Sequence, residues 1–147
     1  MSDSLFLDTA FIQALLNQQD QYHQVAQLFL PRLQKATQVW TTEAVLVEVG
    51  NALSRYRRQT AAGFIKRCYQ MANMQVVSVD TVLLQQAVAL YEARADKDWG
   101  LTDCISFVVM QQQQLQQAVT TDHHFIQAGY RALMLEAVAL KSTKKVG

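Results

Sequence analysis

Short apolar runs alternate with longer amphipathic segments along the chain. The short runs have the length of strands and are rich in β-branched or aromatic residues, whereas the longer segments repeat apolar residues every three or four positions, as helices do. The predicted strands are residues 5–7, 39–41, 75–79, 118–121 and 132–134. The predicted helices are residues 9–17, 20–29, 42–56, 60–73 and 80–91, one that begins near Thr102, and a short one that ends at Gly129.

This alternation of strand and helix favours a parallel sheet with helices on both faces, because parallel neighbours need a crossover connection. The chain contains no internal repeat and no Pro- or Gly-rich linker. We therefore predict one three-layer α/β/α domain over residues 1–140, with a central parallel sheet of four to five short strands. Residues 141–147 are rich in Lys and are predicted to form a disordered basic tail.

Composition narrows the class of protein. The chain has 147 residues, of which 50% are hydrophobic, and a formal net charge of +1. A chain of this length can bury a core without disulfides or metals, and its charge excludes a strongly basic nucleic-acid coat but not a nucleic-acid enzyme with a local basic patch. Cys68 and Cys104 lie far apart without a CxxC spacing, which indicates a reduced cytoplasmic protein. Neither a secretory signal nor an apolar run of about 18 residues is present, so no membrane association is expected.

Acidic side chains are scarce, and four of them stand at informative places. Asp8 and Asp122 follow the first and fourth predicted strands, whose carboxyl ends share one edge of the sheet. Asp103 lies in the first turn of a helix, where the helix dipole favours a carboxylate. Glu48 is the one acid inside an otherwise apolar helical stretch, so its carboxylate needs solvent, a cation or a hydrogen-bond network.

Two interpretations of these acids compete. Asp8 and Asp122 are in position to be simple N-caps, as we expect for Asp80, and Glu48 is in position to be a half-exposed surface acid. The alternative is that the topology brings the acids together, in which case their repulsion calls for a cation. Oxygen ligands of this kind suit Mg²⁺ or Mn²⁺ better than Zn²⁺.

Several other chemistries lack their sequence patterns. A phosphatase of the haloacid-dehalogenase type would need a second Asp two residues after Asp8, where this chain has Ala10. Walker A and GxGxxG patterns are absent, which argues against ATP or dinucleotide binding. A triad of Ser106, His123 and Asp103 has no GxSxG turn to support it.

Four segments in order carry a family resemblance: LFLDT at 5–9, EAVLVEV at 43–49, LTDCISF at 101–107 and TTDHHF at 120–125. Together they resemble the PIN-domain nucleases, especially the small toxin ribonucleases of the VapC type, over residues 5 to about 135. The resemblance implies a metal-dependent endoribonuclease that hydrolyses RNA with metal-activated water. Its catalytic and metal-binding residues would be Asp8, Glu48, Asp103 and Asp122, and its cofactor Mg²⁺ or Mn²⁺.

The resemblance also implies partners and leaves some choices open. The protein would be the toxin of a toxin–antitoxin pair, with RNA as substrate, a cognate antitoxin and a homodimeric state. The alternatives are an RNA-processing PIN nuclease that is no toxin, and a non-catalytic PIN module that binds RNA or protein. Glu43 competes with Glu48 for the role of the helix acid. Asp96 and Asp98 either add an outer contact to the site or belong to a solvated loop.

Further polar residues near the acids are candidates for substrate binding. Thr9 and Ser106 would orient a water or a phosphate, or else serve the helix start and the packing after Asp103. For His124 a structural hydrogen bond is favoured over a role as ligand or base. Cys104 is expected to pack in the core.

A basic patch ends the predicted helix that contains Glu48 and continues on the next helix. Its cations are candidates to bind RNA phosphates, although cations at a helix end also stabilise the helix through its dipole. They are Arg55, Arg57 and Arg58 at the end of the first helix, and Lys66 and Arg67 on the second. Tyr56 and Tyr69 would be able to stack on a base, but their helical spacing favours packing in the core.

Overall fold

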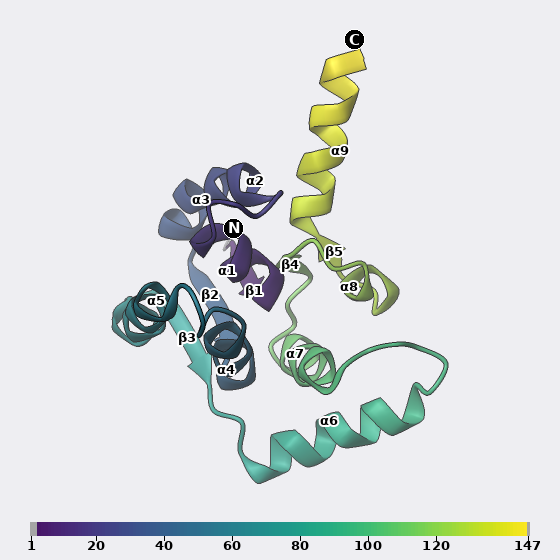
Figure 1. Ribbon diagram of the computed structural model, residues 1–147. Coiled ribbons are helices and arrows are strands. Elements are labelled where there is room, and N and C mark those ends of the chain that lie inside the picture. The colour runs from purple at the N-terminus through teal and green to yellow at the C-terminus, as the bar shows by residue number, and fades with distance from the viewer. Residues whose placement is uncertain (1–2, 147) are drawn as a thin grey trace.

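Five parallel strands form a single sheet in the computed structural model, which describes residues 3–146 and the side chains of residues 3–143 (Figure 1). The strand order is β3-β2-β1-β4-β5. The strands are β1 (Ser4–Leu7), β2 (Gln38–Thr42), β3 (Met74–Val77), β4 (Gln117–Val119) and β5 (Arg131–Ala132). The predicted fold class, a three-layer α/β/α arrangement around a parallel sheet, is thereby confirmed.

Strand β1 occupies the centre of the sheet. Phe6 lies opposite Trp40 of β2 on one side and Ala118 of β4 on the other. Leu5, Phe6 and Leu7 are all buried, because layers of helices cover both faces of a parallel sheet. The carboxyl ends of β1 and β4 therefore lie next to each other, at the edge where ligands of such sheets bind.

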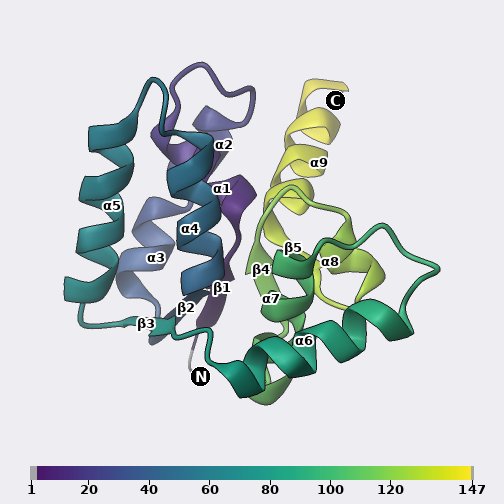
Figure 2. The ribbon, with the colours of Figure 1, turned by 60° about the horizontal axis from the view of Figure 1, so that its bottom comes forward.

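Nine helices within the described residues surround this sheet. They are α1 (Thr9–Leu16), α2 (His23–Leu28), α3 (Leu30–Lys35), α4 (Glu43–Ala52), α5 (Arg58–Gln70), α6 (Thr81–Ala93), α7 (Leu101–Gln112), α8 (His124–Gln127) and α9 (Leu133–Val146). In the view of Figure 1, α2, α3 and α9 lie above the strands and α6 and α7 below them. Figure 2 shows α4 and α5 side by side, with α6 running past α7.

Hydrogen bonds cap the starts of two helices, and the cap by Asp80 is one that the sequence predicts. The Thr42 hydroxyl accepts the backbone N–H of Val45 at the start of α4, and the Asp80 carboxylate accepts that of Leu83 at the start of α6. Gly129 ends the turn after α8 with a φ of +95°, a conformation that glycine adopts without strain.

The predicted helix over residues 20–29 is wrong in its extent, because two short helices occupy residues 23–35. Asp20 does not cap either of them; its carboxylate accepts the N–H of Tyr22 within the preceding turn. The break falls at Phe29, and Pro31 stands in the first turn of α3. Proline lacks the N–H that would continue a single helix, so the chain starts a new one there.

The end of the chain also differs from its prediction. Leu133 and Met134, predicted as strand, are buried at the start of α9, which packs against β4 and α2. The segment predicted as a disordered tail continues this helix through residue 146, with the Thr143 hydroxyl donating to the Ala139 carbonyl. Residue 147 lies outside the described residues. Lysine has a favourable helix propensity, so the Lys-rich segment extends an element that its buried first turn anchors.

Both cysteines are buried and unbridged, and Cys104 packs in the core as predicted. No helix within the described range combines the length and the apolar character needed to cross a bilayer.

Candidate active site

Three aspartates from three separate elements meet at the carboxyl edge of the sheet. Asp8 directly follows β1, Asp103 lies in the first turn of α7, and Asp122 lies between β4 and α8. The charges of Asp103 and Asp122 raise the pKa of Asp8, and the charge of Asp122 raises that of Asp103. The structure therefore brings together the aspartates that the sequence singles out.

Asp8 is the most deeply buried of the three, with 4% of its surface exposed. Burial, followed by the charges of Asp103 and Asp122, raises its pKa from 3.8 to about 7, against the opposing effect of a hydrogen bond from Thr120. That bond runs from the Thr120 hydroxyl to Asp8 Oδ2 over 2.7 Å. Although Asp8 is the residue before α1, its side chain makes no capping hydrogen bond, and its contact with the backbone of Thr9 only partly lowers its pKa. Capping therefore does not account for this carboxylate.

Asp103 is held by two donors on one oxygen. Its Oδ2 accepts the backbone N–H of Gly100 at 3.2 Å and lies 3.0 Å from Nδ1 of His124. Burial is the main cause that raises the pKa of Asp103, while the hydrogen bond with His124 lowers it. The contact with Gly100 fixes the carboxylate at the start of α7. Asp103 therefore stabilises the N-terminus of this helix and is also part of the acid cluster.

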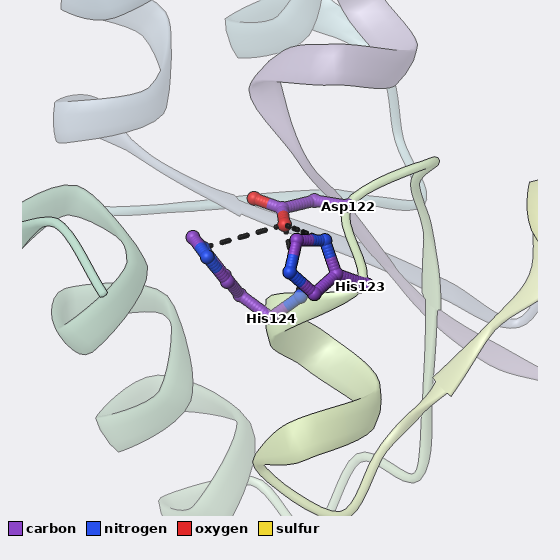
Figure 3. Close-up of side chains that lie close together, drawn as sticks. All are labelled: Asp122, His123 and His124. Atoms are coloured by element: carbon purple, nitrogen blue, oxygen red, sulfur yellow. Dashed lines mark hydrogen bonds and ion pairs between the residues drawn. The ribbon is translucent and has the colours of Figure 1, made fainter. Parts of the chain in front are cut away.

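Asp122 is placed by the turn that leads into α8. Its backbone N–H donates to the Thr120 hydroxyl at 2.9 Å, and its Oδ1 accepts the backbone N–H of His124 at 2.9 Å. In Figure 3 the carboxylate of Asp122 lies between the rings of His123 and His124. The His123 ring is largely exposed and its Nδ1 stays 3.9 Å from Asp122. Asp122 is therefore not the N-cap of α8, which is His123; one of its oxygens is used in the turn just before that helix.

His124 links two of the carboxylates. Its Nδ1 lies 3.0 Å from Asp103 Oδ2 and 3.4 Å from Asp122 Oδ1, and only 19% of its side chain is exposed. The predicted structural hydrogen bond of His124 is thus made to a site carboxylate. Because both contacts use one oxygen of each acid, the structure shows no hydrogen bond to Asp103 Oδ1 or Asp122 Oδ2 from the described residues.

Glu48 lies on an exposed face of α4 and makes no hydrogen bond or ion pair with the described residues. It lines a cavity of about 590 Å³ together with Glu43 and Thr102, the residue before Asp103. Glu43 faces the same cavity, but its Oε2 accepts the Tyr69 hydroxyl at 2.7 Å, and this bond lowers the pKa of Glu43. The carboxylate of Glu43 is thus engaged with α5, whereas that of Glu48 is available.

The two hydroxyls next to the acids differ in their surroundings. Ser106 is fully buried and donates to the carbonyl of Thr102 within α7, at 3.1 Å. Thr9 is 95% buried, and its hydroxyl has no hydrogen-bond partner among the described residues. An orphaned hydroxyl beside Asp8 is costly unless a water or a ligand satisfies it.

The basic patch lies beyond the helix to which the sequence assigned it. Helix α4 ends at Ala52, so Arg55 stands in the following turn and Arg58 begins α5, both of them exposed. The prediction that Tyr56 and Tyr69 pack in the core is wrong, since they are 81% and 57% exposed. Tyr56 is exposed because α4 ends at Ala52, before the turn that contains this residue.

Asp96 and Asp98 lie in the exposed loop before α7. Both oxygens of Asp96 accept hydrogen bonds from the Arg94 guanidinium, at 3.0 and 3.1 Å, and Asp98 is exposed. Neither contributes to the pKa shifts of Asp8 or Asp103. A solvated loop describes them better than a contact with the site.

The donor set fits a hard divalent cation. Three carboxylates in mutual repulsion, together with an orphaned buried hydroxyl, offer oxygen ligands of the kind that Mg²⁺ and Mn²⁺ take. Asp122, His123 and His124 also present potential ligand atoms within 4.8 Å of one another. A cation at this edge would offset the repulsion from Asp103 and Asp122, which adds to the effect of burial in raising the pKa of Asp8.

Thr120 is the contributor that the sequence analysis did not assign. It is fully buried at the end of β4, donates to Asp8 and accepts from the backbone of Asp122. Its place two residues before Asp122, at the end of a strand next to β1, is the signal that would have pointed to it.

Comparison with known proteins gives one family. The PIN domain matches residues 5–129. A search of curated proteins finds no match by sequence.

Solved structures extend this likeness to the fold. The chain is similar to VapC20 of Mycobacterium tuberculosis, described as a toxin that cleaves the sarcin–ricin loop, with 27% identity, a TM-score of 0.77, and coverage of 86% of this chain and 95% of that one. VapBC2 of Rickettsia felis, solved bound to a DNA fragment from its promoter, matches with 12% identity, a TM-score of 0.63, and coverage of 88% and 96%. FitAcB of Neisseria gonorrhoeae matches with 16% identity, a TM-score of 0.60, and coverage of 87% and 95%.

Proposed function

The chain belongs to the PIN-domain family, and from that membership we propose that it is a divalent-metal-dependent endoribonuclease that acts as the toxin of a toxin–antitoxin pair. The similarity to VapC20, described as a toxin that cleaves the sarcin–ricin loop, supports this proposal. The observation that carries the proposal is the convergence of Asp8, Asp103 and Asp122, each from a different element, beside the unpartnered hydroxyl of Thr9.

In this proposal Asp8, Asp103 and Asp122 hold Mg²⁺ or Mn²⁺, and Glu48 reaches the same ion from α4, directly or through water. Such an ion, when bound, lowers the pKa of a water molecule and stabilises charge on a phosphodiester. Glu48 is preferred over Glu43 because Glu43 accepts the Tyr69 hydroxyl, whereas the Glu48 carboxylate has no hydrogen bond within the described part of the chain.

The remaining residues are proposed to hold the site carboxylates, orient water and bind phosphate for an in-line hydrolysis. Thr120 holds one oxygen of Asp8 and leaves the other for a ligand. The Thr9 hydroxyl is available to orient a water or a phosphate oxygen, and Ser106 supports the first turns of α7 from within the helix. Arg55 and Arg58 are proposed to bind phosphates of the RNA from the turn after α4.

The test is RNA cleavage with and without added Mn²⁺. We expect cleavage that excess EDTA abolishes, and loss of cleavage in Asp8→Asn and Asp103→Asn. The matched control is Asp80→Asn, which changes a strand-end aspartate that only caps a helix. Undiminished cleavage in EDTA, or in both site variants, would contradict the proposal.

The proposed partners are a cognate antitoxin and a second copy of the chain, in the cytoplasm. The similarity to VapBC2 supports the antitoxin. If the protein is a toxin, expression alone should arrest growth, and co-expression of the small protein encoded next to it should restore growth. For the homodimer we expect twice the 16.6 kDa chain mass in light scattering at tens of micromolar, and a monomer mass there would reject it.

A further inference from the structure

A polar cavity of about 400 Å³ lies apart from the three aspartates, where the last turn of α1 approaches the turn between α4 and α5. It is lined by Asn17, Gln19, Ala52, Leu53, Tyr56 and Arg57. Two of these side chains, Arg57 and Tyr56, have properties that packing does not explain.

Arg57 is fixed by a neutral partner. Its Nε and Nη2 donate to Asn17 Oδ1 at 3.2 and 2.8 Å, and the same oxygen accepts the backbone N–H of Gln19 at 3.0 Å. An amide oxygen orients the guanidinium without neutralising it, and none of the ion pairs among the described residues includes Arg57. Two of its five N–H groups are used, so the rest can bind an anion in the two-pronged manner that suits phosphate.

Tyr56 presents an aromatic ring at the same cavity. The side chain is 81% exposed, and the Arg55 guanidinium lies 5.3 Å from the centre of its ring. Exposed aromatic rings flanked by arginines are the surfaces on which proteins stack unpaired bases. An acidic peptide would use the cations but would gain little from the ring.

Two helices lead from the cavity towards the acids, α1 towards Asp8 and α4 towards Glu48. Helix α1 has Asp8 before its first residue and Asn17 after its last, and its eight residues span ~12 Å. On α4, Ala52 lines the cavity four residues after Glu48, ~6 Å along the axis. A ligand in the cavity would therefore lie within a few nucleotides of the acids.

We propose that this cavity is a nucleotide subsite, which takes one unpaired nucleotide of an RNA strand with its phosphate on Arg57 and its base on Tyr56. Asn17 is the positioning residue that holds the guanidinium in place. The identity of the ligand as RNA rests on the proposed function, whereas the anion and stacking chemistry rests on the geometry above.

The experiment measures binding apart from cleavage. A fluorescently labelled single-stranded RNA of ten nucleotides is titrated with the full chain carrying Asp103→Asn, in EDTA, and its anisotropy is followed. We expect Tyr56→Ala and Arg57→Gln each to weaken binding about tenfold, and Arg57→Gln to reduce the salt slope by about 0.7. Tyr56→Phe keeps the ring and should stay within twofold, and Arg57→Lys, which keeps the charge but not the planar fork, should fall between.

Matched control variants remove a tyrosine ring or a cation at exposed positions outside the cavity. Tyr91→Ala deletes another exposed tyrosine and Lys35→Gln another exposed cation, and both should bind within twofold of the parent. Asn17→Ala, which keeps every charge, should weaken binding if the orientation of Arg57 matters. Thermal melts of each variant establish that it is folded.

Four outcomes would overturn the subsite: no RNA binding by the parent, unchanged binding in Tyr56→Ala and Arg57→Gln, a loss in Arg57→Gln alone, or equal displacement by an oligoglutamate of the same charge. The last two would indicate a general anion site and an acidic peptide, respectively. If the wild type does not cleave RNA with Mn²⁺ while both cavity variants still lose binding, the nuclease proposal fails and the subsite stands.

Discussion

Asp8 carries a carboxyl group whose ionisation opposes folding of the metal-free protein. Its pKa is raised from 3.8 to about 7 in the folded state, chiefly by burial. Between these pH values the unfolded chain loses the proton while the folded chain keeps it. Stability contributed by this group is therefore present below pH 4 and is lost as the pH rises towards 7, by about 4 kcal/mol in all.

The first prediction follows for Asp8→Asn in EDTA. Asparagine keeps an oxygen that accepts the Thr120 hydroxyl and removes the titration. At pH 8 the variant should have a higher free energy of unfolding in urea than the wild type, by up to a few kcal/mol, and the two should converge near pH 4. If the difference in free energy of unfolding between the two proteins does not depend on pH, the ionisation of Asp8 does not destabilise the fold.

His124 provides the second prediction. Its ring binds one oxygen of Asp103 and approaches one of Asp122, so it orients both carboxylates. Partners of this kind are worth about 10–100-fold in metal affinity. His124→Ala should weaken Mn²⁺ binding about tenfold or more in calorimetric titration, whereas His123→Ala, which removes a largely exposed ring, should change it little. Equal effects in the two variants would contradict the positioning role.

At the scale of elements, Asp8 and Asp80 both follow predicted strands in the sequence but have different roles in the structure. The Asp80 carboxylate accepts the backbone N–H of Leu83 in the first turn of α6, whereas the Asp8 side chain makes no such cap for α1. Asp80→Ala should cost about 1 kcal/mol of stability in chemical unfolding, Asp80→Asn should restore most of it, and neither should alter the response to Mn²⁺. A stabilised Asp80→Ala protein would indicate that Asp80, too, is a charge under repulsion.

The order of the elements is predictable from the sequence because strand and helix periods alternate clearly. Boundaries fail where one pattern serves two structures. Leu133 and Met134 are buried, and two adjacent apolar residues do not distinguish a strand from the first turn of a helix. Likewise, Leu53 and Tyr56 continue the apolar spacing of α4, although the helix ends at Ala52 and only Leu53 is buried.

In the candidate site, too, some residues are predictable from the sequence and others are not. Asp8 and Asp122 are predictable because the topology of a parallel sheet fixes where strand ends meet, and Asp103 because it opens a helix. The contact of Arg57 with Asn17 joins residues 40 positions apart, and no periodic pattern encodes it. Such contacts depend on how two helix ends approach each other, which a single sequence does not specify.

For the molecule as a whole, metal binding and folding are one equilibrium. A cation that binds only the folded cluster stabilises it by RT ln(1 + [metal]/Kd), about 2.7 kcal/mol at one hundred times Kd. The melting temperature of the wild type should therefore rise steadily with Mn²⁺ concentration. Asp103→Asn should respond much less; in EDTA it should gain less stability than Asp8→Asn, because it weakens the contact with His124. If Mn²⁺ does not change the melting temperature of the wild type, the aspartates do not form a shared metal site.

The central place of β1 has a consequence for how the protein is made. The Thr120–Asp8 hydrogen bond joins residues 112 positions apart, and β1 pairs with β4 as well as with β2. During translation, Asp8 leaves the ribosome long before Thr120 and Asp122 are synthesised. The three aspartates cannot meet on a nascent chain that stops short of them, and closing so long a loop is slow. A cell that makes this protein thus has an interval, set by the rate of elongation, in which the chain exists but its acid cluster does not.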